Sequence, residues 1–178
     1  MTQKRCFPPV VDANTRVLVL GSLPGEASLA QSQYYAHKQN RFWSLIGDVT
    51  EEDLSRLDYL ARLQALLRHR VGLWDVVAQA QREGSLDSRI RNHASNDLVA
   101  LVESLPHLAA VAFNGGTAAR LGMRALQGAV GKVEFMSLPS SSPAYTMPYA
   151  QKLKAWEALR PWLVEGDSVD ASRSSGTE

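Results

Sequence analysis

Residues 16–43 read RVLVLGSLPGEASLAQSQYYAHKQNRFW, and this stretch decides the fold. Its first five residues, Arg16 to Leu20, form a short apolar run that contains β-branched side chains and stops at a glycine. Such a run is typical of a buried strand in a parallel sheet. Ligands of parallel sheets bind beyond the carboxyl ends of the strands. We therefore expect a functional site in the loop that begins at Gly21.

The loop after this strand is framed by two glycines, Gly21 and Gly25, with Pro24 between them. Glycine lets the backbone come close to a ligand and present its N–H groups, and proline stiffens the turn. A loop of this kind can bind a base edge or a phosphate without using side chains. The pattern alone is more often an ordinary connection between a strand and a helix, so the residues that follow carry the argument.

Tyr34 and Tyr35 are adjacent aromatic residues in a segment rich in Gln and Ser. No helical or strand alternation places both rings in a core. We therefore expect at least one ring to face a cavity, where it can stack on a nucleobase. Asn40 comes just before the apolar pair Phe42-Trp43. Its amide is either held at the edge of that cavity by a packed helix start or serves as the N-cap of the helix.

Strand-like and helix-like segments alternate along the rest of the chain. Apolar residues at helical spacing predict helices, and short apolar runs predict strands. The predicted helices are 41–49, 53–70 with its six leucines in the core, 96–105, one that starts at 116–121, and 148–163. The predicted strands are 108–113 and 133–138, with a short strand or turn at 73–77. The polar segment 82–92 is expected to cross near the site. This order favours an α/β fold of three layers, in which helices cover both faces of a mostly parallel central sheet.

Two further loops are expected at the same edge of the sheet if the three clear strands are parallel neighbours. Asn114 follows the strand 108–113 and can hydrogen-bond a base edge with one donor and one acceptor group, or it is a turn residue before Gly115. The loop 139–145 offers three hydroxyls and backbone amides for phosphates, with an apolar tip that can enter the vacated base stack. A solvent-exposed turn is the alternative for this loop.

The length of 178 residues fits one domain. We expect this domain to span residues 1–164, because residues 165–178 are small, polar and poor in apolar side chains, as in a disordered tail. The tail carries a net charge of −3, which leaves +4 on residues 1–164. The expected domain is therefore moderately basic, as suits a protein that binds nucleic acid.

Composition also limits the class of protein. Hydrophobic residues make up 45% of the chain, but no run is long enough for a membrane span, and we expect a cytoplasmic protein without a signal peptide. Cys6 is the only cysteine, which excludes an internal disulfide and a four-cysteine iron–sulfur cluster. The four histidines have no ligand spacing. We expect neither a metal nor a cofactor.

Several motifs in the same order resemble the uracil-DNA glycosylase superfamily. The turn G-S-L-P-G at 21–25, the aromatic Tyr35 and the run A-H-K-Q-N-R-F-W at 36–43 are similar to the G-I-N-P-G and A-H-P-x-N-R-F-W of the mismatch-specific uracil/thymine-DNA glycosylases. Leu23 stands where that family has its water-positioning asparagine, and Lys38 stands where it usually has proline. The G-S-L-P-G form, the double tyrosine and the segments 84–88, 113–116 and 138–144 together resemble the hypoxanthine-DNA glycosylases, the branch called family six.

The resemblance spans roughly residues 17–162 and implies a monofunctional enzyme of base-excision repair. Such an enzyme flips a deaminated base out of DNA and hydrolyses its N-glycosidic bond, and hypoxanthine is the expected base. In that branch the asparagine matching Asn40 is the catalytic residue, which would position the water that attacks C1′. The implied base-binding residues are Gly21, Ser22, Leu23, Pro24, Gly25, Tyr35, Phe42 and Asn114. The expected DNA-binding residues are His37, Lys38, Ser140, Ser141, Ser142, Pro143 and Tyr145.

Other interpretations stay open. His37 equally fits an ordinary hydrogen-bonded surface histidine. The enzyme can instead be a uracil- or mismatch-directed glycosylase in which Asn40 serves a smaller base. Because Leu23 cannot orient a nucleophile, a non-catalytic DNA-binding module is a third interpretation. In each case the expected partner is DNA that contains a deaminated base. We expect a monomer, which suits a protein that must wrap a kinked duplex.

Overall fold

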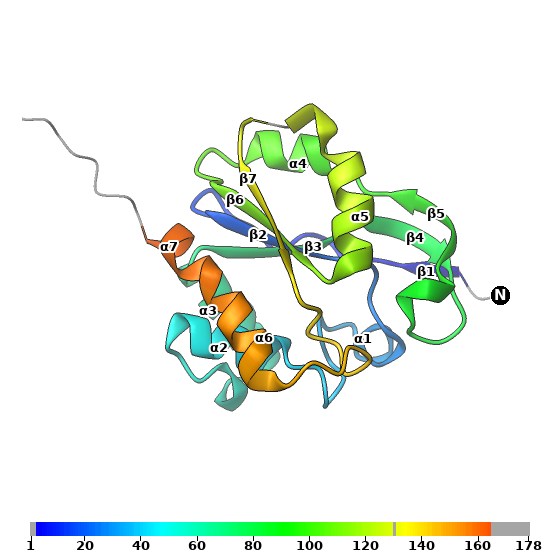
Figure 1. Cartoon of the computed structure of the whole chain (residues 1–178), viewed down its shortest axis with the longest axis horizontal. Coiled ribbons are helices and arrows are strands. Elements are labelled where there is room, and N and C mark those ends of the chain that lie inside the picture. The colour runs from blue at the N-terminus through cyan, green and yellow to red at the C-terminus, as the bar shows by residue number, and fades with distance from the viewer. Residues whose placement is uncertain (1–2, 130, 165–178) are drawn as a thin grey trace, which may run out of the picture.

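A parallel sheet of four strands crosses the middle of the molecule (Figure 1). The computed structural model describes residues 3–129 and 131–164, so the expected tail at 165–178 lies outside the described residues. The strand order is β3-β2-β6-β7, and all neighbouring pairs are parallel. The strands are β2 (Val17–Gly21), β3 (Val71–Asp75), β6 (Ala110–Asn114) and β7 (Glu134–Leu138). The prediction of three parallel neighbours, β2, β6 and β7, is confirmed.

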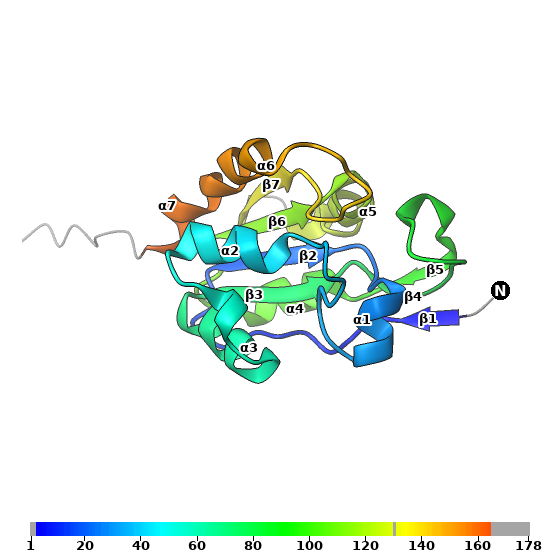
Figure 2. The same cartoon turned by 90° about the horizontal axis from the view of Figure 1, so that it is seen from below.

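Helices cover both faces of this sheet, as Figures 1 and 2 show, which confirms the three-layer α/β/α prediction. On one face lie α2 (Phe42–Thr50), α3 (Tyr59–Arg68), α6 (Tyr149–Trp156) and α7 (Arg160–Leu163). On the other lie α4 (Leu98–Ser104) and α5 (Gly116–Ala125). Shorter helical segments lie in the connections between these elements: α1 (Glu26–Gln31), η1 (Leu54–Arg56), η2 (Asp87–Arg89), η3 (Gln127–Ala129) and η4 (Glu157–Leu159).

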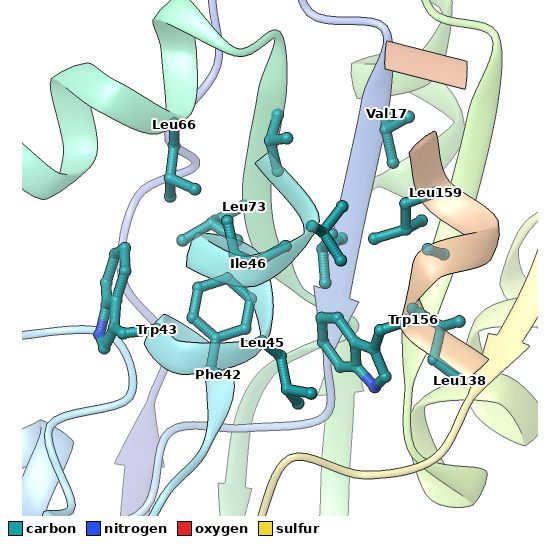
Figure 3. Packing of buried hydrophobic residues seen from close by; sticks show 14 of the residues in the cluster. Val17, Phe42, Trp43, Leu45, Ile46, Leu66, Leu73, Leu138, Trp156 and Leu159 are labelled. Carbon is teal, nitrogen blue, oxygen red and sulfur yellow. The ribbon is translucent and has the colours of Figure 1, made fainter. Parts of the chain in front are cut away.

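Alternate side chains of the central strand β2 fill two apolar clusters. Val17 and Val19 point to the face covered by α2, α3 and α6, whereas Leu18 and Leu20 point to the face covered by α4 and α5. Because successive side chains of a strand point to opposite faces, a strand that is apolar at every position must be covered on both sides. Figure 3 shows part of the first cluster, in which α2 and the α6 region lie side by side over the same face of the sheet.

The segment 53–70 is not the continuous helix that its leucine spacing predicts. It divides into η1 and α3, and each part starts at an aspartate whose side chain accepts a hydrogen bond from a backbone N–H two or three residues later, Asp53 from Ser55 and Asp58 from Ala61. This capping favours two short helices over one long one. The core assignment holds for Leu54 and fails for Leu60, which is 70% exposed.

A second, antiparallel sheet of three strands extends the molecule beyond β3. Its order is β1-β4-β5, formed by β1 (Gln3–Arg5), β4 (Val77–Gln81) and β5 (Arg91–Ser95). β4 starts directly after β3 and runs past the end of β2, where the N–H groups of Val76 and Val77 donate to the carbonyls of Gly21 and Ser22 at 2.8 and 3.0 Å. These bonds fix the start of the Gly21–Gly25 loop.

Candidate active site

The loops after β6 and β7 meet at the carboxyl edge of the sheet and hold each other through buried hydrogen bonds. The Asn114 amide donates to Ser141 Oγ at 2.9 Å, and its carbonyl accepts the Ser141 backbone N–H at 2.9 Å. Both residues are buried, with exposed fractions of 8% and 1%. The Ser141 carbonyl in turn accepts the backbone N–H of Arg41 at 3.0 Å. One asparagine therefore fixes a loop that contacts the segment of Asn40.

Asn40 itself is half-buried just before α2. Its Oδ1 accepts the backbone N–H of Phe42 at 3.0 Å, and its own N–H donates to the carbonyl of His37 at 2.9 Å. The N-cap of α2 is Arg41, so the N-cap interpretation of Asn40 is wrong. The Asn40 side chain still bonds the first residue of the helix, which uses one of the two lone pairs of its carbonyl oxygen. The second lone pair and the Nδ2 amide have no partner among the described residues, so both can serve a ligand.

The two tyrosines have different roles. Tyr34 is 3% exposed, and its hydroxyl donates to the carbonyl of Pro8 at 3.0 Å, so it belongs to the core. Tyr35 has a left-handed backbone with a φ of 54°, and its ring stacks on Phe42 with centroids 4.0 Å apart and planes inclined by 22°. A left-handed non-glycine residue costs of order 1–3 kcal/mol and is concentrated at functional sites.

Phe42 lies behind Tyr35 and does not face the site. It is completely buried, and the rings of Trp43 and Trp156 cover it edge-on (Figure 3). The expectation that Phe42 touches a base directly is therefore replaced by a supporting role, in which it holds one face of the Tyr35 ring.

The Gly21–Gly25 loop presents backbone and little else. Ser22 and Leu23 are each 6% exposed, and Leu23 packs into the apolar cluster under α4 and α5. The carbonyl of Pro24 accepts a hydrogen bond from the Arg82 guanidinium. A base or phosphate bound here would meet the backbone of the loop, because the side chain of Leu23 is directed into the core.

The structure adds a buried acid that sequence analysis did not assign to the site. Asp75, the last residue of β3, is 3% exposed, and its Oδ2 has no hydrogen-bond partner in the part of the chain that the structure describes. Its Oδ1 lies 2.7 Å from where a Cβ on Gly21 would be, and the Tyr35 hydroxyl lies 3.1 Å from the same point. Burial and, to a smaller extent, nearby Asp87 raise the pKa of Asp75 to about 7, and Arg82 opposes this shift.

The loop after β4 brings a charged pair, Arg82 and Asp87, close to Asp75. Arg82 is completely buried, and its Nε donates to the carbonyl of Gly84 at 2.9 Å. Its Nη1 lies 3.7 Å from a carboxylate oxygen of Asp87. Burial raises the pKa of Asp87, and the Ser22 hydroxyl and Arg82 lower it. The expectation that the segment 82–92 passes near the loop after β2 is confirmed, because Arg82 bonds the Pro24 carbonyl and Ser85 lies beside Gly25.

The only sequence signal for Asp75 was a charged residue within the apolar run 73–77.

The loop after β7 ends in an exposed tip on a fixed base. Ser140 Oγ accepts the N–H of Ser142 at 3.1 Å, and Ser142 Oγ accepts the N–H of Ala144 at 3.2 Å. With Ser141 buried, the hydroxyls of all three serines shape the loop. Tyr145 at the tip is 46% exposed, and Pro143 is exposed beside it.

Lys152 of α6, which sequence analysis missed, supports the tip. It is 3% exposed, its Nζ donates to the carbonyl of Ser142 at 3.1 Å, and it lies 5.5 Å from the centroid of the Tyr145 ring. On the other rim of the site, His37 and Lys38 are exposed, and His37 Nδ1 accepts the N–H of Gln39 at 3.1 Å.

Within residues 3–129 and 131–164, no cluster of three or more His, Cys, Asp or Glu side chains could hold a metal ion. In the same residues, every helix is too short or too polar to cross a bilayer.

The fold is therefore that of an α/β protein. Its candidate site for a flat, polar base is formed by the loops after β2, β6 and β7, the ring of Tyr35 and the amides of Asn40 and Asn114. The chain belongs to the uracil-DNA glycosylase superfamily, whose family model matches residues 8–162. It is 40% identical over 156 residues to a hypoxanthine DNA glycosylase of Methanosarcina acetivorans, a match that covers 88% of this chain and 97% of that protein. It is 46% identical over 113 residues to a hypoxanthine DNA glycosylase of Methanosarcina barkeri, covering 64% of this chain and 72% of that protein.

A solved structure agrees with this assignment. The solution NMR structure of a protein from Methanosarcina acetivorans, described as a candidate uracil DNA glycosylase, has a TM-score of 0.81 and 40% sequence identity to this chain. The match covers 91% of this chain and 99% of that one.

Proposed function

We propose that this protein is a monofunctional DNA glycosylase that removes hypoxanthine from DNA by hydrolysing the N-glycosidic bond of deoxyinosine. The names of the two relatives support the substrate, and the position of Asn40 supports the chemistry. We propose further that residues 1–164 act as one domain and as a monomer.

The observation that carries this function is the contrast between Leu23 and Asn40. The loop after β2 has no exposed side chain that could orient a water, because Leu23 is buried in the core. Asn40 has a carbonyl lone pair and an amide that no described residue bonds, and the hydrogen bond from the Phe42 N–H holds its side chain in place. An amide is a weak base and contributes by positioning and polarising the attacking water, which is the proximity term of catalysis.

The base would be bound by backbone and rings. A purine flipped from the duplex would stack on the face of Tyr35 that Phe42 does not cover, and such stacking contributes about 1–3 kcal/mol per base. The backbone of Gly21–Gly25 would contact its edge. Asn114 keeps one amide proton beyond its bonds to Ser141, so it can contribute at most a single donor while it holds the loop.

The loop after β7 would enter the duplex. Pro143 and Tyr145 at its tip are exposed and would fill the space that the flipped base leaves, which lowers the cost of a few kcal/mol for unstacking. Ser140, Ser142, His37 and Lys38 flank the site and would contact phosphates through hydroxyls, ring nitrogens or charge.

A matched pair of variants tests the role of Asn40. Asn40→Ala should slow single-turnover excision of hypoxanthine by about 100-fold or more, because the water loses its positioning group. Gln39→Ala removes the neighbouring exposed amide and should leave the rate unchanged. Abasic products are cleaved with alkali and resolved on a denaturing gel.

Binding is measured in parallel to separate catalysis from affinity. Both variants should bind a deoxyinosine duplex as the parent protein does. Asn40→Ala with a near-normal rate would contradict the assigned role, and excision of uracil in place of hypoxanthine by the parent protein would favour a uracil-directed enzyme.

A further inference from the structure

Two buried polar groups beside Gly21, from Asp75 and Tyr35, have no hydrogen-bond partner among the described residues. Asp75 Oδ2 and the Tyr35 hydroxyl are buried, and neither makes a hydrogen bond of good geometry within residues 3–129 and 131–164. Burial raises the pKa of the Tyr35 hydroxyl, although the Asn114 side chain is close enough to oppose this rise. The carboxyl group and the hydroxyl both lie against Gly21, where an added methyl group would be 2.7 Å from the other carboxylate oxygen, Asp75 Oδ1, and 3.1 Å from the Tyr35 hydroxyl. Buried polar groups without partners are rare in folded proteins and call for an explanation. A ligand between the loops would provide one.

The position of Asp75 suits a role towards that ligand. It stands at the carboxyl end of β3, directly beside Gly21 at the end of β2, where ligands of parallel sheets bind. Its backbone is fixed, because Asn96 Nδ2 donates to the Asp75 carbonyl at 2.7 Å. The backbone that carries the carboxyl group is therefore fixed at the site, and no described residue forms a hydrogen bond with Oδ2.

We propose that Asp75, in its protonated form, is the general acid that donates a proton to N7 of the departing purine. This inference rests on the proposed excision of hypoxanthine. The C1′–N9 bond breaks with its electron pair moving into the purine, the Asp75 proton adds to N7, and hypoxanthine leaves as a neutral base. Water adds to the oxocarbenium carbon C1′, and the proton that it releases returns through solvent to the Asp75 carboxylate. The sum is deoxyinosine and water giving hypoxanthine and an abasic site.

The surroundings of Asp75 favour the protonated form near neutral pH. The facing titratable groups are Asp87 and Arg82 from the loop after β4 and the hydroxyl of Tyr35, with Cys6 and Tyr34 further away. Burial is the largest cause of the raised pKa of Asp75, and the Asp87 charge adds to it. A general acid is most effective when its pKa lies near the working pH.

The test is the pH dependence of single-turnover excision from a deoxyinosine duplex. For the parent protein, the rate should be highest below pH 7 and fall about tenfold per pH unit above it. Asp75→Asn, which has the same shape, should excise at least about 100-fold more slowly at pH 6.5 and show no fall above pH 7. Its affinity for a duplex with 2′-fluoro-2′-deoxyinosine, which resists cleavage, should match the parent's.

Asp87→Asn provides an independent test, because it keeps the Asp75 side chain and changes only the charge beside it. Removing the Asp87 charge lowers the pKa of Asp75, so the midpoint of the rate profile should move to lower pH while the profile keeps its shape. This second variant decides the matter if Asp75→Asn does not fold. An unchanged midpoint, or a profile that becomes flat in Asp87→Asn, would overturn the assignment to Asp75.

The two proposals fail in different ways. A parent protein that does not release hypoxanthine at any pH overturns the proposed function and this inference with it. A parent protein that excises hypoxanthine at a rate independent of pH between 6 and 8, or an Asp75→Asn variant with an unchanged profile, overturns the general acid alone.

Discussion

Replacing Asn114 with alanine should destabilise the protein by releasing the loop after β7. The side chain makes two hydrogen bonds of 2.9 Å to Ser141, and both residues are buried. A hydrogen bond contributes about 1 kcal/mol net, and a buried donor left unpaired costs about 1–3 kcal/mol. Because the variant loses both bonds and leaves the Ser141 N–H unpaired, the free energy of unfolding should fall by about 2–4 kcal/mol.

Thermal unfolding measures this change directly. In a domain of this size each kcal/mol shifts the Tm by about 2–4 °C, so the Tm should fall by roughly 5–15 °C. Asn114→Asp is the matched control, since its carboxylate can accept from both the N–H and the hydroxyl of Ser141 and should retain most of the stability. If Asn114→Ala kept its Tm within about 2 °C while losing excision, the amide would serve the base and the loop argument would be refuted.

Three further changes test separate parts of the structure. Leu66→Ala should cost about 2–5 kcal/mol of unfolding free energy in urea titrations, whereas Leu60→Ala, at a side chain that is 70% exposed, should cost less than about 0.5 kcal/mol. Gly21→Ala should slow excision by displacing the Asp75 carboxyl, which lies 2.7 Å from the new methyl group; an unchanged rate would contradict that close approach. Folding raises the pKa of Asp75 from 3.8 to about 7. Its contribution to the free energy of unfolding is therefore present below about pH 4 and is lost as the pH rises through 7. The free energy of unfolding of the parent, relative to that of Asp75→Asn, should fall by up to about 4 kcal/mol between pH 4 and 8. A difference that stays constant with pH would mean that the carboxyl does not titrate in this range.

The parts of the fold that sequence analysis predicted are those with a strong local signal. β2 and β6 are apolar runs that end at a glycine or an asparagine, and β7, which is mixed, ends just before Pro139. Parallel sheets place the loops that follow such strands together. The apolar pair Phe42-Trp43 after Asn40 likewise marked the start of α2. Motif order then connected these loops to one family.

The antiparallel sheet was missed because its strands carry little apolar signal. β5 reads RNHAS, and a polar edge strand can be identified only from its partner. The segment 53–70 has helical leucine spacing throughout, which predicts one helix, but the capping aspartates Asp53 and Asp58 divide it into two. Local propensity is a weak prior against such competing signals.

The candidate site was likewise only partly predictable from the sequence. Tyr35 and Asn40 could be proposed from their motifs, but the distinction between the two tyrosines needed the hydroxyl of Tyr34 to be seen bonded to Pro8. Asp75 looked like an interruption of an apolar run. Its meaning depends on burial and on its contact with Gly21, which lies far away in the sequence and is adjacent only in the sheet.

The most direct test of the account compares two substrates with one protein. The parent protein is incubated in buffer with a metal chelator and with matched duplexes that contain a single deoxyinosine or a single deoxyuridine, and alkali cleaves any abasic site. We expect strand cleavage at deoxyinosine and little or none at deoxyuridine. Cleavage at deoxyuridine alone would contradict the assignment of the purine, and cleavage at neither would contradict the assignment of a glycosylase for these bases.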